Sequence, residues 1–285
     1  MVEEIDERKH MDAVWYWFLT GEVQQALSRK YQLMEKLQRG LFGILPGAPR
    51  CFDCKVPLSG VGSLAVRPLG VRPSSFSPRL CNRCEEYVRK HEAGAEVELS
   101  LLFADVRGST ELAEKLAPGE FKQLIQRFYK VTTDQLIGHN AMVNRLMGDQ
   151  VIGLFVPHFA GRDHAKVAVQ TALDILRATG HQDPDGPWVP VGIGVHTGLA
   201  YVGAVGTKQG VNEIAVLGNA ANLAARLSAQ AATGEVIASG ATATQARLDA
   251  GTWIGNVRDV SEVKTLNLKG MKEPVSVRVL RVGPG

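Results

Sequence analysis

From residue 97 onward the sequence predicts a mixed α/β (α+β) fold in which strands and helices follow the order βαββαβ. Three observations support this prediction. Apolar runs of strand length alternate with segments whose apolar residues recur at helical spacing, glycine-containing turns separate the two kinds of segment, and no internal repeat appears. We therefore expect one domain here, with helices packed on a sheet.

Each element of the predicted order has its own signal. Residues 97–106 are an apolar run of strand length, residues 121–136 have the apolar spacing of an amphipathic helix, and residues 142–156 indicate two strands joined by a tight turn. The later elements are, in order, a helix over residues 165–178, two strands over residues 189–205 with a break near Gly198, a helix after Gly218, and paired strands over residues 266–282. This order is that of the ferredoxin-like core, with additional elements after it.

Two smaller parts precede this domain. In residues 1–45 apolar residues recur at helical spacing, which favours a helical hairpin that covers a core or pairs with its copy. A membrane-surface helix is the weaker alternative, because the polar positions mix acidic and basic residues. Residues 46–96 hold too few apolar residues for a core and need another source of stability. We therefore predict three parts, over residues 1–45, 46–96 and 97–285.

The overall composition is that of an ordinary globular protein. With 45% hydrophobic and 21% charged residues the chain does not resemble a disordered one, and its net charge of +3 does not by itself imply a polyanionic partner. No apolar run approaches the roughly 20 residues that span a bilayer. The longest candidate, Val14 to Leu19, is short and follows acidic residues where a signal peptide would be basic. We expect no membrane span and a cytoplasmic location.

Four cysteines occur as two Cys-x₂-Cys pairs, Cys51 with Cys54 and Cys81 with Cys84. In a reducing compartment such pairs are more often metal ligands than disulfides, and this spacing fits a tetrahedral zinc site with four cysteine ligands. An iron–sulfur cluster also accepts four cysteines, and we favour Zn²⁺ over it.

The cysteine segment is also basic, which raises the alternative of a nucleic-acid-binding surface. Between Arg50 and Lys90 there are eight Lys or Arg residues against three Asp or Glu. The aromatic residues that stack on bases in such surfaces are few, only Phe52, Phe76 and Tyr87. We therefore favour a structural or regulatory role for this segment and expect no nucleic-acid partner.

The first motif that points to chemistry lies at the end of the first predicted strand. This strand delivers the carboxylate of Asp105, and the turn through Gly108 then leads into a helix that begins near Ser109 and Thr110. Backbone N–H groups of such a turn bind phosphate, and a carboxylate beside them suits Mg²⁺ bridging to a triphosphate. The alternative is that Asp105 merely caps the helix.

A second motif places Asp149 at the tip of a tight hairpin, after Asn144 and Arg145. The alternative is that Asp149 only forms the turn, because Gly-Asp is a common pair of turn residues. Two carboxylates from different strands can hold two ions about 3.5–4 Å apart, as two-metal phosphoryl transfer requires. Asp105 and Asp149 are therefore a candidate metal pair.

The third and fourth motifs supply candidate polar and cationic groups. Asn222 and Arg226 are four residues apart, so both project from one face of a helix that is otherwise mostly alanine. Such a pair can orient a ribose and neutralise a pentavalent phosphorus, although alone it could be a solvated surface pair. Lys269 precedes Gly270 at a strand turn and can reach a terminal phosphate, or it is an ordinary surface lysine.

Taken in order along the chain, these four motifs resemble the catalytic domain of bacterial-type class III adenylyl and guanylyl cyclases. The resemblance covers residues 97–282, including residues 194–198, which are similar to that family's central strand pair. It implies that Asp105 and Asp149 bind two Mg²⁺ or Mn²⁺ ions, that Asn222 and Arg226 orient the ribose and stabilise the transition state, and that Lys269 binds the triphosphate. In that family the metal residues and the helix pair come from different protomers, which implies a homodimer.

The chain departs from the family pattern at the two positions that read the base. The family usually has Lys for ATP or Glu for GTP where this chain has Arg145, and Asp or Thr where it has Ala215. Arginine can donate to adenine N1 but also to guanine O6 and N7, and alanine cannot accept from the adenine amino group. We expect an adenylyl cyclase acting on ATP, with relaxed purine specificity. The alternatives are a guanylyl or dual-specificity cyclase and a non-catalytic nucleotide-binding protein.

Overall fold

The computed structural model describes residues 2–74, 77–90, 92–206, 212–248, 253–254, 257–258, 262–268, 270–271 and 273–283. The chain forms two compact units. One unit joins Met1–Val97 with Tyr201–Leu217, and the other joins Glu98–Ala200 with Gly218–Gly285. The division of the sequence into three parts stays a prediction, since its two N-terminal parts fall into the same unit.

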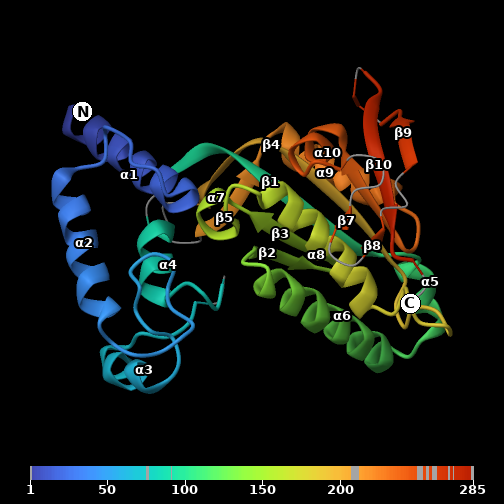
Figure 1. Cartoon of the computed structure of the whole chain (residues 1–285), viewed down its shortest axis with the longest axis horizontal. Coiled ribbons are helices and arrows are strands. Elements are labelled where there is room, and N and C mark those ends of the chain that lie inside the picture. The colour runs from blue at the N-terminus through green and yellow to red at the C-terminus, as the bar shows by residue number, and fades with distance from the viewer. Residues whose placement is uncertain are drawn as a thin grey trace. The chain divides into compact units, whose positions relative to one another are not determined.

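The second unit contains most of a mixed sheet and the helices that cover it (Figure 1). The strands of the main sheet are β1 (Gly94–Val106), β2 (Met142–Met147), β3 (Gln150–Phe155), β4 (Val191–Gly206), β5 (Asn212–Leu217), β6 (Glu235–Ser239), β9 (Glu262–Leu266) and β10 (Val275–Arg281); the start of β1, the end of β4 and all of β5 belong to the first unit. A separate small sheet pairs β7 (Trp253–Ile254) with β8 (Val257–Arg258). The helices of this unit are α5 (Ser109–Lys115), α6 (Pro118–Gly138), α7 (Pro157–Ala160), α8 (His164–Ala178), α9 (Asn219–Gln230) and α10 (Gly240–Gln245).

The strand order confirms the predicted fold class. The main sheet runs β2-β3-β1-β4-β6-β10-β9, with β5 paired to β4. Its first four strands follow β1-α6-β2-β3-α8-β4 along the chain, which is the predicted βαββαβ core. β4 and β6 are parallel, whereas β1 with β3, β2 with β3, and β6 with β10 are antiparallel.

Two apolar clusters lie on opposite faces of this sheet. On β6, Val236 and Ala238 pack into the cluster formed with α6, α8 and α10. Ile237 lies between them in sequence and packs instead with Leu223 and Leu227 of α9. Because successive strand residues point to opposite faces, α9 covers the face opposite to α6, α8 and α10. The helix that carries Asn222 and Arg226 is therefore separated by the sheet from the other large helices.

The structure corrects two details of the predicted elements. β4 is continuous from Val191 to Gly206 and does not break near Gly198, because that glycine has no left-handed backbone and continues the extended strand. The last strand pair begins earlier than predicted, at Glu262, because Val263 and Lys264 pair with β10. β5 and β6 were not singled out by the sequence pattern.

The first unit holds the N-terminal helices and the cysteine segment. Its helices are α1 (Val2–Thr20), α2 (Arg29–Gly43), α3 (Val61–Val66) and α4 (Asn82–Arg89), with a short 3₁₀ turn, η1 (Arg67–Leu69). The predicted helical segment is thus two helices, and α1 buries Trp15, Phe18 and Leu19. Within this unit the Ala204 amide of β4 donates to the Ala93 carbonyl at 2.9 Å. None of the helices in the described residues has the length and apolar character needed to cross a bilayer.

Candidate active site and cysteine cluster

The two candidate metal carboxylates lie at neighbouring strand ends. Asp105 is near the end of β1, where it pairs in register with Gln150, the first residue of β3. Asp149 occupies the tight turn before it, after Gly148 with its left-handed φ of 62°. The Val106 amide donates to the Asp149 carbonyl at 3.1 Å, which fixes the turn against β1. The structure therefore brings together the two residues that the sequence predicted as a pair.

The surroundings of Asp105 shift the pKa of its carboxyl. Burial raises the pKa of the Asp105 carboxyl, the Arg107 guanidinium acts in the opposite direction, and repulsion from Asp149 raises the pKa again. The side chain remains 22% exposed, so it is open to a small ion. A carboxylate whose ionised form is disfavoured by burial and by a neighbouring carboxylate suits a site for a hard divalent cation, because a cation would offset both effects on Asp105.

Arg107, which the sequence pattern did not single out, contacts one of the candidate metal carboxylates. Its guanidinium forms an ion pair with the Asp105 carboxylate and donates to the Ala231 carbonyl, just beyond α9, at 3.4 Å. It passes over Gly192 of β4, where an added Cβ would lie 3.1 Å from Arg107 Nε. The contact with Asp105 could have been predicted from the sequence, because the two residues are only two positions apart. The contact with Ala231 could not, because these two residues are far apart in the sequence.

The turn after β1 is arranged by Gly108 and Ser109. Gly108 is the N-cap of α5 with a left-handed φ of 64°, so Asp105 does not cap this helix and that alternative is wrong. The Ser109 hydroxyl donates to the Asp149 carboxylate, and Thr110 is exposed beside it. The turn thus links the predicted phosphate-binding residues directly to the metal pair.

A cleft of about 570 Å³ opens beside this turn. Ser109, Thr110 and Asp149 line one side, and residues of α6 line the other. From α6 the hydroxyl of Tyr129 donates to the Gly148 carbonyl at 2.6 Å and holds the hairpin tip. Tyr129 was also missed, because nothing in the helical spacing of α6 distinguishes it from its neighbours.

The α9 pair is positioned by close packing of that helix against β4. A Cβ on Gly194 would lie 2.2 Å from the Ser228 amide nitrogen and 2.5 Å from the Ala224 carbonyl oxygen. The alanine-rich helix therefore packs directly against the backbone of β4. Asn222 is exposed, and Arg226 is half-buried with its guanidinium beside Gly270.

In the described part of one chain, the candidate metal pair and the α9 pair are not linked to each other by a polar contact. Across the described residues, no hydrogen bond or ion pair joins either α9 side chain to either aspartate, and Arg226 is not among the causes of the shifted Asp105 pKa. Three further residues were predicted to bind the base or the phosphates. Arg145 is exposed on β2, Ala215 faces Gly203 across the β4–β5 pair, and Lys269 lies outside the described residues.

Comparison with known proteins decides the family. Residues 92–279, well over half of the chain, match the family model described as the adenylate and guanylate cyclase catalytic domain. The chain belongs to this family of class III cyclases.

Individual relatives agree with this assignment. The cyclase chain is 28% identical over 165 residues to proteins named adenylate cyclase from Mycobacterium bovis and Mycobacterium tuberculosis. The match covers 58% of this chain but only 36% of those relatives, so most of their length has no counterpart in it. Among solved structures, the guanylyl cyclase Cya2 is 26% identical with a TM-score of 0.57, over 67% of this chain and 95% of that one. The adenylyl cyclase CyaB from P. aeruginosa shares the fold at 21% identity and a TM-score of 0.55, over 66% and 95%.

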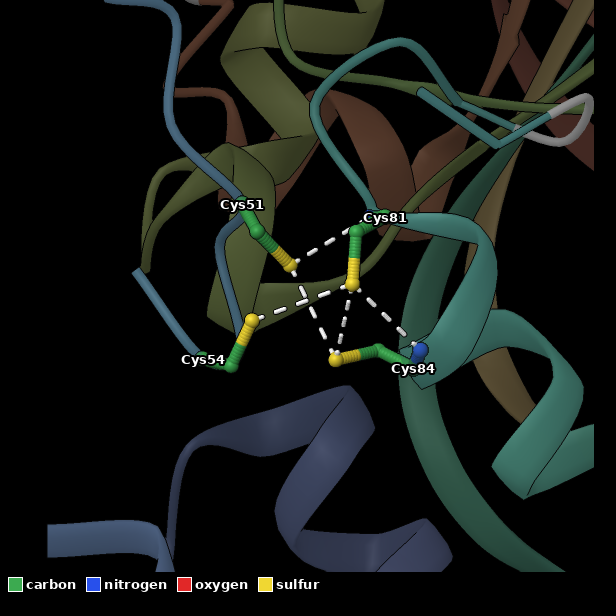
Figure 2. A group of neighbouring side chains, drawn as sticks. All are labelled: Cys51, Cys54, Cys81 and Cys84. Carbon is green, nitrogen blue, oxygen red and sulfur yellow. Dashed lines mark hydrogen bonds between the residues drawn. The ribbon is translucent and has the colours of Figure 1, made fainter. Parts of the chain in front are cut away.

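The four cysteines of this cyclase converge in the first unit. Their Sγ atoms all lie within 4.8 Å of one another, and none forms a disulfide (Figure 2). Cys51 and Cys54 flank a turn that ends with Lys55 in the left-handed region, and Cys81 is the N-cap of α4, which carries Cys84. The predicted grouping of four cysteines is therefore present.

The spacing of the sulfurs fits a tetrahedral metal centre. Individual Sγ–Sγ distances are 3.9 Å for Cys51–Cys84, 3.7 Å for Cys54–Cys81 and 3.3 Å for Cys81–Cys84. Four sulfurs at about 2.3 Å from a zinc ion stand about 3.8 Å apart. The Cys84 amide donates to Cys81 Sγ and the Cys81 amide to Cys51 Sγ, and such donors stabilise thiolates. Hydrogen bonds among the four thiols lower the pKa of Cys81 and raise that of Cys84. This donor set suits a soft divalent metal such as zinc.

Proposed function

We propose that the chain converts ATP to 3′,5′-cyclic AMP and pyrophosphate at a site completed by a second copy of the chain. One observation carries this proposal. Asp105 and Asp149 form a carboxylate pair at adjacent strand ends, whereas the α9 side chains that the reaction also needs have no link to this pair within the described part of one chain. A homodimer in which each copy supplies one half provides two complete sites.

Asp105 and Asp149 would hold two Mg²⁺ or Mn²⁺ ions. When bound, these ions would favour loss of the ribose 3′-hydroxyl proton and neutralise the triphosphate. The chain's own contribution is to keep the two carboxylates in place. Arg107 holds Asp105, and Ser109 and Tyr129 hold Asp149 and its turn.

The reaction forms a bond between the ribose 3′-oxygen and the α-phosphorus and breaks the bond to the β-phosphate. The hydroxyl proton is lost and pyrophosphate leaves with the bonding electrons. Asn222 would hold the ribose, and Arg226 would bind the negative charge that develops on the phosphate oxygens. Gly108, Ser109, Thr110 and Lys269 are proposed to bind the phosphates, the first three through the turn that borders the cleft.

ATP is the proposed substrate, with limited discrimination against GTP. Arg145 would read the base by donating to it, and Ala215 offers no side-chain acceptor for the adenine amino group. The alternative of a guanylyl or dual-specificity cyclase draws support from the 26% identical guanylyl cyclase structure. A non-catalytic nucleotide-binding protein is a weaker alternative, since both carboxylates and both α9 side chains are retained.

A turnover assay with MgATP, MnATP, MgGTP and MnGTP tests this proposal, with the cyclic product identified by mass spectrometry. We expect cyclic AMP and pyrophosphate in equal amounts, and a larger kcat/KM for ATP than for GTP. A larger value for GTP would make the chain a guanylyl cyclase. Binding of nucleotide without turnover under all four conditions would favour the non-catalytic alternative.

We also propose that the cluster of four cysteines holds a structural Zn²⁺ ion. Metal analysis of the purified protein should give close to one zinc per chain, and Cys51→Ser should lower the unfolding temperature. Detection of iron and sulfide, together with visible absorbance, would show that the cysteines hold an iron–sulfur cluster instead of zinc. Absence of any metal would show that the four cysteines are not a metal site. The location in the cytoplasm expected from the sequence stays a prediction.

A further inference from the structure

One stripe of helix α2 contacts the rest of its own unit. Tyr31 stacks on Tyr87 with ring centroids 6.1 Å apart. Arg39 lies over the Trp17 ring at 5.2 Å and donates to the Asp53 carbonyl at 2.9 Å. Tyr31, Glu35 and Arg39 are four residues apart, so they form a single stripe along the helix. None of the residues of this 15-residue helix is fully buried.

An adjacent face of α2, with its C-cap residue Ile44, carries an exposed apolar stripe, whose first residue, Met34, also borders a cavity with Asp53 of the same unit. Met34, Leu37, Leu41 and Ile44 are 51%, 64%, 66% and 82% exposed. Their spacing of three, four and three residues is the a–d spacing of a coiled-coil seam, which is narrower than the apolar face of a helix lying on a core. A helix with this pattern is suited to pack against another helix.

The charges around the stripe favour a second copy of the same helix over an anionic membrane. The positions that flank Met34 to Ile44 are occupied by Leu33, Gln38 and Gly40, and the exposed Lys30 extends the seam at its N-terminal end. Two copies that pack antiparallel therefore meet without like charges facing each other. A membrane-surface helix instead carries Lys or Arg beside its apolar face. Lys36 lies off the seam, and Arg39 faces the unit's own interior.

We propose that this α2 seam, Met34, Leu37, Leu41 and Ile44, docks against the same seam of a second copy of the chain. This inference rests on one part of the proposed function, namely that the active form is a dimer. It adds a contact through the N-terminal unit, separate from the residues that bind nucleotide. The seam would hold two chains together, so that their catalytic halves meet at lower protein concentration.

The test compares two matched double variants of the full chain. Leu37→Glu/Leu41→Glu changes the seam, and Val61→Glu/Leu64→Glu changes two apolar residues of α3 that are similarly exposed, at 76% and 60%. Sedimentation velocity over a dilution series gives the dimer dissociation constant. We expect the seam variant to raise it at least about tenfold and the control to leave it within about twofold. Turnover per site should recover in the seam variant at high protein concentration.

An unchanged dissociation constant in the seam variant would overturn the proposal while leaving the proposed function intact. If the same variant then unfolds at a lower temperature, the seam packs against its own chain. A wild-type chain that is dimeric through the seam but does not turn over nucleotide would contradict only the proposed function. A wild-type chain that stays monomeric at every concentration would contradict both.

Discussion

The guanidinium of Arg107 forms an ion pair with the carboxylate of Asp105. The same guanidinium reaches the Ala231 carbonyl next to the end of α9, so it links the strand that carries a metal carboxylate to the helix that carries Asn222 and Arg226. Because the ion pair engages one carboxylate oxygen, Oδ2, the other oxygen remains available to a cation. Arg107 is therefore a positioning residue for Asp105.

Arg107→Ala should raise the Mg²⁺ concentration needed for half-maximal activity by about tenfold, because Asp105 loses the partner that orients it. Arg107→Lys should lie between the wild type and Arg107→Ala. Metal titrations at saturating ATP, with unfolding temperatures as a control for the fold, measure this. A lower Mg²⁺ requirement in Arg107→Ala would show instead that Arg107 competes with the metal.

Arg145→Glu should raise the ratio of kcat/KM for GTP to that for ATP. A carboxylate accepts from guanine N1 and N2 but repels the acceptor N1 of adenine, and Ala215 opposes neither base. Parallel initial-rate measurements with both nucleotides give the ratio. If it is unchanged in a folded, active variant, this position does not read the base.

Gly194→Ala should destabilise the catalytic unit by about 1–3 kcal/mol, because the new Cβ would overlap the backbone of α9 at Ser228 and Ala224. It should also lower kcat by shifting Asn222 and Arg226. Gly119→Ala in α6 is the matched control, since no atom lies within 4 Å of its added Cβ. Chemical denaturation should show no loss for the control, and equal stability of the two variants would refute the close packing.

His196 should make the chain less stable in mild acid. Burial lowers the pKa of this imidazole to about 4, and its Nδ1 lies 2.7 Å from Ser239 Oγ. The unfolded chain binds this proton near pH 6.5 and the folded chain only near pH 4. The free energy of unfolding should therefore fall as the pH drops from about 6.5 to about 4, by up to about 3 kcal/mol from this residue.

The measurement is chemical denaturation of the wild type and His196→Gln at several pH values in that interval. The variant should show a shallower pH dependence. Part of the slope should remain, since burial also lowers the pKa of His164 and His181. If the free energy of unfolding of the variant depends on pH as steeply as that of the wild type, groups other than His196 cause the loss of stability in mild acid.

The sequence predicted those parts of the fold and site that depend on local pattern. The strand-end position of Asp105, the turn at Asp149 and the close approach of the alanine-rich α9 follow from apolar period, turn residues and side-chain size. The grouping of the four cysteines follows from paired spacing and from the lack of a core around them.

The parts that were missed depend on contacts distant in sequence. The continuity of β4 through Gly198 depends on its neighbours in the sheet, not on its own glycines. The roles of Arg107 and Tyr129 appear only when Ala231 and Gly148 are brought beside them. The spacing of apolar residues along the chain does not predict such contacts, because they depend on tertiary packing.

Mixing two inactive variants tests the shared active site most directly. Asp149→Ala removes a proposed metal ligand, and Arg226→Ala removes the proposed transition-state donor, which should cost about 10²–10³ in kcat. When subunits exchange at random, half of the dimers are mixed, and each mixed dimer has one intact site of two. The mixture should therefore recover about a quarter of wild-type activity. If it stays as inactive as its parents after verified subunit exchange, the two halves of the site do not come from different chains.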